Sequence, residues 1–235
     1  MDSTQKNARF AGLLYLLVVL TAPIGLLYVP GKLIVHGDAA VTASRILAAQ
    51  SLFRIGIVSM LASSVIFLLL ALALFRLLKD VNQRWAVLMA ILALMQVPIA
   101  FLNEVNSLAA LMLERGGGFL TVFQESQRQA LAMLFLDLHG QGLIVTESFW
   151  GLWLIPFAWL VFRSGFLPRF LGVWLNVNGL AYLAVSLTGL LFPENYKLVS
   201  KIAMPFLLGE MATMLWLLIR GARPKVVAAS RSASA

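Results

Sequence analysis

The chain has 235 residues, of which 61% are hydrophobic and 12% are charged, and its mean hydropathy is +0.91. A soluble domain carries about 25% charged residues and must cover its surface with polar groups, so this composition argues against a soluble enzyme, a disordered chain and a nucleic-acid-binding protein. The net charge of +8 fits an integral membrane protein, because basic residues between apolar segments set orientation and contact anionic lipid head groups.

About six segments are long enough to cross the hydrocarbon core as helices, which requires about 20 residues. They are residues 8–28, 54–78, 85–113, 140–162, 168–192 and 202–220. The strict alternation of short β-barrel strands is absent from them. We therefore predict an all-α polytopic membrane helix bundle with about six transmembrane helices, forming a single domain over residues 1–220.

The first segment follows Lys6 and Arg9, as the apolar part of a signal peptide would. It is longer than the roughly 7–15 residues of a cleavable signal, so we interpret it as a retained first span. In the first outer loop, Asp38 is predicted to cap an interfacial helix that passes through Arg45 before the second span. Lys32, Asp38 and Arg45 are candidates for a lid over an intramembrane cavity, and a solvated loop is the alternative.

The fourth apolar segment is longer than one span requires. It runs from residue 127 to residue 162 and is interrupted by only a few polar side chains. We expect an additional or a broken helix to precede the span, because glycines flank Gln141 and favour a bend.

The distribution of basic residues predicts the orientation. About eleven Lys and Arg residues fall on the side of both termini and about seven on the other. Both termini are therefore predicted to be cytoplasmic, and residues 221–235 to form a disordered basic tail.

Ionisable residues inside apolar segments are the main functional clue, since each costs about 2.5–3.5 kcal/mol at mid-membrane. The candidates for ligand binding or proton relay are Arg54, Glu104, Asp137, His139, Glu147 and Glu210. Such groups must point inward, become protonated or pair with one another. We therefore predict that they converge on a polar site in the outer half of the bundle.

Two pairings are predicted within this site. Arg54 is the best-placed partner for Glu210, either as a ligand site or as a structural ion pair. A bend near residue 140 would turn His139 toward Asp137 or Glu147, giving a proton relay, an acid–base pair or a weak metal site. The alternative for His139 is an interfacial imidazole that hydrogen-bonds a loop carbonyl. On the third span, Gln96 and its neighbours form a polar stripe that either lines a cavity or links helices.

The sequence argues against several bound groups. The chain contains 2 His and 0 Cys residues, and no Lys lies in the middle of a span. Bis-His haem, Schiff-base chromophores, thiolate metal sites and Fe–S clusters are therefore disfavoured, and we predict neither a cofactor nor a metal. Membrane lipids and a small or lipid-like ligand are the expected partners, and no nucleic acid is expected.

Several short motifs occur in a recognisable order. They are residues 31–40 (GKLIVHGDAA), 51–56 (SLFRIG), 135–140 (FLDLHG) and 163–172 (RSGFLPRFLG), followed by the Gly209-Glu210 pair. From about residue 9 to residue 220 the chain resembles the bacterial membrane family catalogued as domain of unknown function 4386. The resemblance implies a multi-pass protein of the bacterial inner membrane. It implies no activity and no site residues.

Three functional hypotheses follow from the residues. The first is a protein that binds or transports a small or lipid-like ligand at the polar site. The second is an intramembrane enzyme that acts on a lipid, with Asp137 and His139 as acid and base. The third is a structural or accessory membrane protein without a ligand, whose polar groups would all be satisfied internally.

Overall fold

The computed structural model describes residues 3–222, and all regular secondary structure in this range is helical. Six segments are long and apolar enough to cross a membrane: Ser3–Leu33, Gln50–Leu78, Gln83–Arg115, Glu125–Arg163, Arg169–Leu191 and Pro193–Ile219. The predicted all-α, six-span architecture is therefore confirmed, and the protein is a multi-pass helical membrane bundle.

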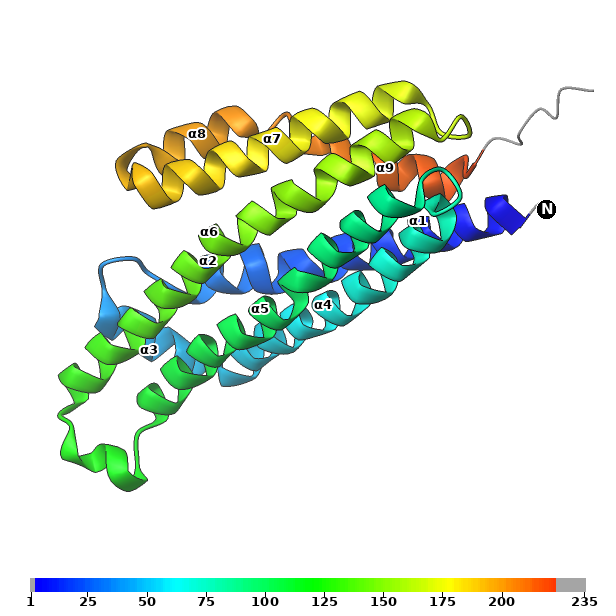
Figure 1. The fold of residues 1–235 in the computed structure, drawn as a ribbon. Helices are drawn as coiled ribbons and strands as arrows, with labels where there is room; N and C mark the ends of the chain where they lie inside the picture. The colour runs from blue at the N-terminus through cyan, green and yellow to red at the C-terminus, as the bar shows by residue number, and fades with distance from the viewer. Residues whose placement is uncertain (1–2, 223–235) are drawn as a thin grey trace, which may run out of the picture.

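The chain order is shown in Figure 1. The elements are α1 (Ser3–Pro23), η1 (Ile24–Tyr28), α2 (Val29–Leu33), α3 (Ala39–Ala48), α4 (Gln50–Leu78), α5 (Gln83–Arg115), η2 (Gly118–Val122), α6 (Glu125–Arg163), α7 (Arg169–Leu191), η3 (Pro193–Asn195), α8 (Tyr196–Ala203) and α9 (Leu208–Ile219). The first span is built from α1, η1 and α2, and the last is interrupted between α8 and α9.

Helix α6 packs along both α5 and α7, while α1 packs against α4 and α9. The two ends of the described chain lie side by side (Figure 1), and Gln5 Nε2 donates a hydrogen bond of 3.0 Å to the Arg220 carbonyl. Gly12 allows the close approach of α1 and α9, because a Cβ there would lie 2.7 Å from Leu218 Cα. We call this end of the bundle the terminal end and the opposite end the distal end.

The helix predicted in the first loop is present at the distal end. The Asp38 side chain accepts a hydrogen bond of 2.9 Å from the Val41 N–H, so it caps α3 as predicted. This helix packs against α5 and α6.

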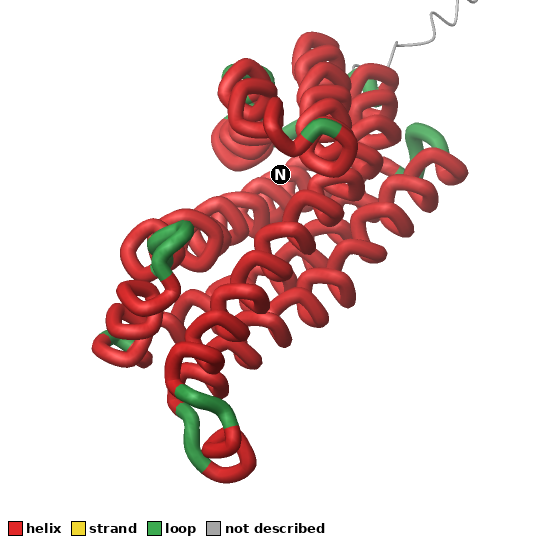
Figure 2. The backbone as a smooth tube through the Cα atoms, turned by 90° about the vertical axis from the view of Figure 1, so that its left-hand side faces the viewer, coloured by secondary structure: helices red, strands yellow, loops and turns green. Residues whose placement is uncertain are grey.

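Helix α6 corrects the expectation of a broken or additional helix. It is a single helix of 39 residues, about 58 Å long at 1.5 Å per residue, so it extends past a hydrocarbon core of about 30 Å. Figures 1 and 2 show it projecting with α5 at the distal end. The glycines produce no break because Gly142 packs against the Asn103 side chain of α5.

The buried core has two apolar blocks. The block at the terminal end includes Leu70, Ala93 and Trp153, and the block at the distal end includes Ile57 and Ala110. On both α4 and α5, a stretch between the two blocks lines a cavity. The polar site therefore lies where apolar packing is interrupted.

The predicted tail begins close to the end of the described residues. Ala222 is 4% exposed and belongs to the terminal block, so packing continues to this residue. Residues 223–235, where the remainder of the predicted tail falls, lie outside the described residues.

Candidate functional site

A cavity of about 300 Å³ lies between the two core blocks, enclosed by residues of α1, η1, α4, α5, α6, α7 and α9 together with Leu207. Its polar and ionisable lining residues are Tyr15, Ser63, Ser64, Gln96, Asn103, Glu104, Thr146, Tyr182 and Glu210. The lining also includes Met211, which is 43% exposed, so the cavity wall reaches the outer surface of the bundle at α9. This volume is at the lower end of the range of small-molecule sites.

Three helical segments around the cavity carry a proline beside it, and two of them are interrupted there. Pro23 lines the cavity and is followed by the π-helical turn η1, while Pro98 lies inside α5 between the lining residues Val97 and Ala100. Pro205 lies in the interruption between α8 and α9, next to the lining residue Leu207. Proline removes a backbone donor, and π-helical turns are frequent at functional sites.

Glu210 occupies the wall contributed by α9. The hydroxyl of Tyr15, a buried residue of α1, donates a hydrogen bond to Glu210 Oε1. Tyr182 of α7 also interacts with this carboxyl group and lines the same cavity. The partners of Glu210 are thus neutral hydroxyl groups from two other spans.

The interruption before α9 explains how Glu210 is held. The first N–H groups of a helix lack intrahelical partners, and α9 begins only two residues before Glu210. The Glu210 N–H donates a hydrogen bond of 3.2 Å to Asn178 Oδ1, and Asn178 is fully buried on α7. Asn178 therefore fixes the start of α9 and with it the position of the carboxyl group.

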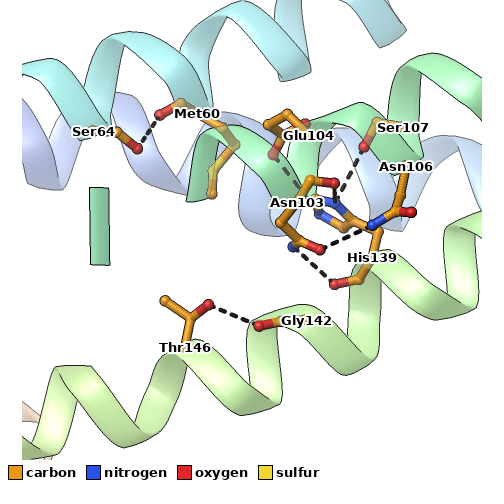
Figure 3. Close-up of polar contacts among 9 residues, drawn as sticks. All are labelled: Met60, Ser64, Asn103, Glu104, Asn106, Ser107, His139, Gly142 and Thr146. Carbon is orange, nitrogen blue, oxygen red and sulfur yellow. Dashed lines mark hydrogen bonds and ion pairs between the residues drawn. The ribbon is translucent and has the colours of Figure 1, made fainter. Parts of the chain in front are cut away.

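Glu104 lies on the wall contributed by α5, beside the imidazole of His139 from α6 (Figure 3). His139 Nδ1 lies 3.2 Å from the Asn103 carbonyl oxygen and 3.3 Å from Ser107 Oγ. Since a carbonyl oxygen only accepts, Nδ1 carries the proton of the neutral imidazole. The lone pair of Nε2 then faces Glu104 Oε1 at 3.9 Å, which is longer than a hydrogen bond. One bridging water or a small side-chain movement would let the two groups exchange a proton.

The Asn103 side chain joins the same two helices. Its Nδ2 donates a hydrogen bond of 3.0 Å to the His139 carbonyl, and its Oδ1 accepts one of 3.3 Å from Asn106 Nδ2. A Cβ at Gly142 would lie 2.6 Å from Asn103 Cγ, so only glycine leaves room for this amide (Figure 3). Gly142 therefore positions Asn103, which in turn holds the backbone of His139.

Gln96 is a third polar group in the lining. It is 6% exposed, and its Nε2 has no hydrogen-bond partner among the described residues. A buried amide without a partner costs about 1–3 kcal/mol. The cavity lining therefore contains a hydrogen-bond donor, Gln96 Nε2, that lacks an acceptor from the described residues.

The predicted pairing of Asp137 with His139 is wrong. In the unbroken helix α6 these residues point in nearly opposite directions, and Asp137 is exposed. The imidazole faces Glu104 and the backbone of α5 instead. The alternative prediction, in which His139 hydrogen-bonds a backbone carbonyl, is correct about the type of partner. The carbonyl is that of Asn103 in the neighbouring span α5 and not one in a loop.

The predicted pairing of Arg54 with Glu210 is also wrong. Arg54 is exposed near the start of α4, whereas the lining residues of that helix begin at Met60. Between residues 3 and 222, the ion pair found within 4.0 Å is that of His139 with Glu104. Within the described part of the chain, the side chains that interact with the Glu210 carboxyl group are those of Tyr15, Tyr182 and Asn178.

Two further predictions change in detail. Glu147 accepts a hydrogen bond of 3.2 Å from the Tyr196 hydroxyl of α8 and lies outside the cavity lining. Lys32, Asp38 and Arg45 are exposed, and Arg45 Nη1 donates to the Lys32 carbonyl at 3.3 Å. None of these three residues belongs to the described lining, so the loop does not form the predicted lid.

Tyr15, Tyr182 and Asn178 were not among the predicted site residues. A tyrosine or an asparagine within an apolar segment is usually an interfacial anchor or a helix-linking amide, so its type alone gives no signal. Their convergence on Glu210 depends on the packing of α1, α7 and α9. Within residues 3–222, no group of three His, Cys, Asp or Glu side chains is arranged to hold a metal ion.

The fold and this cavity together define a multi-pass helical membrane protein with a polar cavity inside the bundle. The model of the family described as "Domain of unknown function (DUF4386)" matches residues 10–221, so the chain belongs to this family. The resemblance inferred from the short motifs is thereby confirmed. Comparison with curated proteins and comparison with solved structures each gave no match.

Proposed function

We propose that the protein binds, and transports across or within the membrane, a small and largely apolar ligand in the cavity between the two core blocks. The observation that carries this proposal is the cavity itself, about 300 Å³ in volume and lined by six spans. Ligand sites combine a mostly apolar wall with a few polar groups. Phe67 and Trp150 exemplify the apolar wall here, and Glu104 and Glu210 the polar groups.

An accessory protein without a ligand would have a dry interior with every polar group satisfied. The unpartnered Gln96 Nε2 and the size of the cavity argue against that hypothesis. An enzyme acting on a lipid is the second candidate, favoured by the placement of an imidazole and a carboxyl group 3.9 Å apart beside the cavity. In that case Glu104 is the group that meets the substrate, because it lines the cavity and Asp137 does not.

The proposal includes a location. We assign the protein to the bacterial inner membrane with its terminal end in the cytoplasm. The support is the family resemblance to bacterial sequences and the excess of Lys and Arg on the side of the two termini.

Single-cysteine variants test the cavity directly, because the chain contains 0 Cys residues. Ser63→Cys places a thiol in the lining, and Ser186→Cys places one at a fully buried position outside it. In lipid nanodiscs we expect N-ethylmaleimide to modify residue 63 and not residue 186. The neutral amphiphile N-phenyl-1-naphthylamine should slow the reaction at residue 63 by occupying the cavity.

An unreactive thiol at residue 63, or one that the amphiphile does not protect, would contradict a ligand-accessible cavity. Trypsin resistance and elution as a single species provide the control that both variants are folded.

A further inference from the structure

We infer that the ligand is a hydrophobic cation, such as an amine or quaternary ammonium compound, whose charge is held at Glu210. The inference rests on the proposed function and adds the chemical class of the ligand. It depends on three features of the lining: its charge, its aromatic side chains and its unpartnered amide.

The lining has an unbalanced set of charged side chains. It contains Glu104 and Glu210 and, among its described members, no Lys or Arg. Glu104 has His139 as an internal partner, whereas Glu210 meets only neutral groups. An anionic ligand would bring a second negative charge into a low-dielectric space, which is strongly unfavourable. A cation would supply the opposite charge that Glu210 lacks.

Aromatic side chains surround the same space. Tyr15, Phe67, Trp150, Trp153 and Tyr182 all belong to the lining. Trp150 and Tyr182 meet edge to face with ring centroids 5.6 Å apart. Aromatic faces attract cations, and the attraction grows when the cation is removed from water. Such a wall suits an alkylated ammonium group better than a small hydrated ion.

Gln96 provides an independent sign of a ligand. Its side chain lines the cavity, is more than nine-tenths buried, and leaves Nε2 without a partner among the described residues. An N–H donor in this position is satisfied by an acceptor on the ligand or by water carried with it. The cavity therefore offers a carboxylate for a cation and a donor for a polar atom beside it.

Protons should compete with the cation, because a protonated carboxyl group no longer attracts it. Four titratable groups lie around the two carboxyl groups, and three of them face a carboxyl group directly. Tyr15 on α1 and Tyr182 on α7 face Glu210, and His139 on α6 faces Glu104. The fourth, Glu147 on α6, acts on Tyr182 rather than on either carboxyl group directly. The two tyrosines stay neutral near neutral pH. If a proton and the ligand cation exchange at Glu210, transport of the ligand would be coupled to the proton gradient.

The test compares benzyltrimethylammonium with neopentylbenzene, its uncharged isostere, as competitors of N-phenyl-1-naphthylamine in nanodiscs. At about pH 8 the cation should compete at a concentration at least about tenfold lower than the isostere. Glu210→Gln should abolish this advantage. Glu114→Gln is the matched control, because Glu114 is a buried acid of α5 outside the cavity lining. Ala100→Phe should weaken the binding of all three compounds, because the larger side chain fills the cavity.

Equal competition by the two compounds, or an advantage that survives Glu210→Gln, would overturn the inference. If N-phenyl-1-naphthylamine still binds and remains sensitive to Ala100→Phe, the proposed function stands without a cationic ligand. If it does not bind, the proposed function fails first. Should Glu210→Gln not fold, a pH series on the unmodified protein decides. The advantage of the cation must decline from about pH 8 to about pH 5 as carboxylates gain protons.

Discussion

The two acidic residues of the cavity are held in different ways. Glu104 faces the His139 imidazole at 3.9 Å, in a network that joins α5 to α6. The Glu210 carboxyl group accepts a hydrogen bond from the Tyr15 hydroxyl, and the Glu210 backbone N–H donates one to Asn178. An imidazole can take up the proton that a carboxylic acid releases, whereas a tyrosine near neutral pH keeps its proton and interacts only by hydrogen bonding.

This difference separates the two sites by function. Glu104 and His139 together can remain neutral or form an internal ion pair without any ligand. Glu210 as a carboxylate stays uncompensated until a proton or an external cation arrives, since burying an unpaired charge is costly. We therefore expect the Glu104 site to contribute mainly to helix packing and proton storage, and the Glu210 site to respond to ligand.

The largest expected effect comes from closing the space beside Asn103. Gly142→Ala should lower the free energy of unfolding by about 1–3 kcal/mol, because the added methyl group displaces the amide that bonds the His139 backbone. Gly140→Ala is the matched control two residues away, where a Cβ meets nothing within 4 Å. That variant should be neutral or stabilising by up to about 1 kcal/mol.

The two alanine variants are compared by unfolding in mixed micelles with increasing dodecyl sulfate. Equal stability of the two would show that the contact of Gly142 with Asn103 does not hold α5 against α6.

The second prediction removes the partner of Glu104. His139→Phe keeps an aromatic ring and should destabilise the protein by about 1–2 kcal/mol at about pH 8, because an ionised Glu104 is then buried without an imidazolium to compensate its charge. The penalty should shrink as the pH falls, since protonation removes the uncompensated charge. Adding Glu104→Gln to His139→Phe should recover much of the loss at high pH, which a double-mutant cycle measures. A loss that is the same at both pH values would break the proposed pairing.

The sequence predicts the spans and the acid on each wall, and it fails where tertiary packing decides. Hydropathy defines the six spans because crossing hydrocarbon requires length and apolarity alone. Glu104 and Glu210 are found because charged groups are rare in such segments. In an unbroken α6, helix geometry alone directs Asp137 away from His139. The prediction failed because it assumed a bend at the glycines. The missing side chain at Gly142 instead leaves space for the Asn103 amide.

Partners on distant spans leave no comparable signal in the sequence. Tyr15 lies 195 residues before Glu210, and its hydroxyl group meets the carboxyl only because α1 packs on α9. By charge, Arg54 would be a stronger partner for Glu210 than Tyr15 is. Its position in α4, however, leaves it exposed near the distal end. Chemical complementarity thus identifies what Glu210 requires, and helix packing decides which side chain supplies it.

The smallest effect is expected for a single hydroxyl group, and it separates the cavity from its surroundings. Tyr15→Phe should cost about 1 kcal/mol of stability, since it removes one donor from Glu210. It should also lower the affinity for benzyltrimethylammonium, because the carboxylate that binds the cation is less well held. Ser186→Ala is the control. It removes a buried hydroxyl group outside the cavity lining, which donates a hydrogen bond of 2.7 Å to the Ile144 carbonyl. This variant should lose about 0.6 kcal/mol of stability and no affinity. Equal losses of affinity in both variants would mean that probe binding follows the overall stability of the bundle, and the distinction between the Glu210 site and the rest of the helix contacts would disappear.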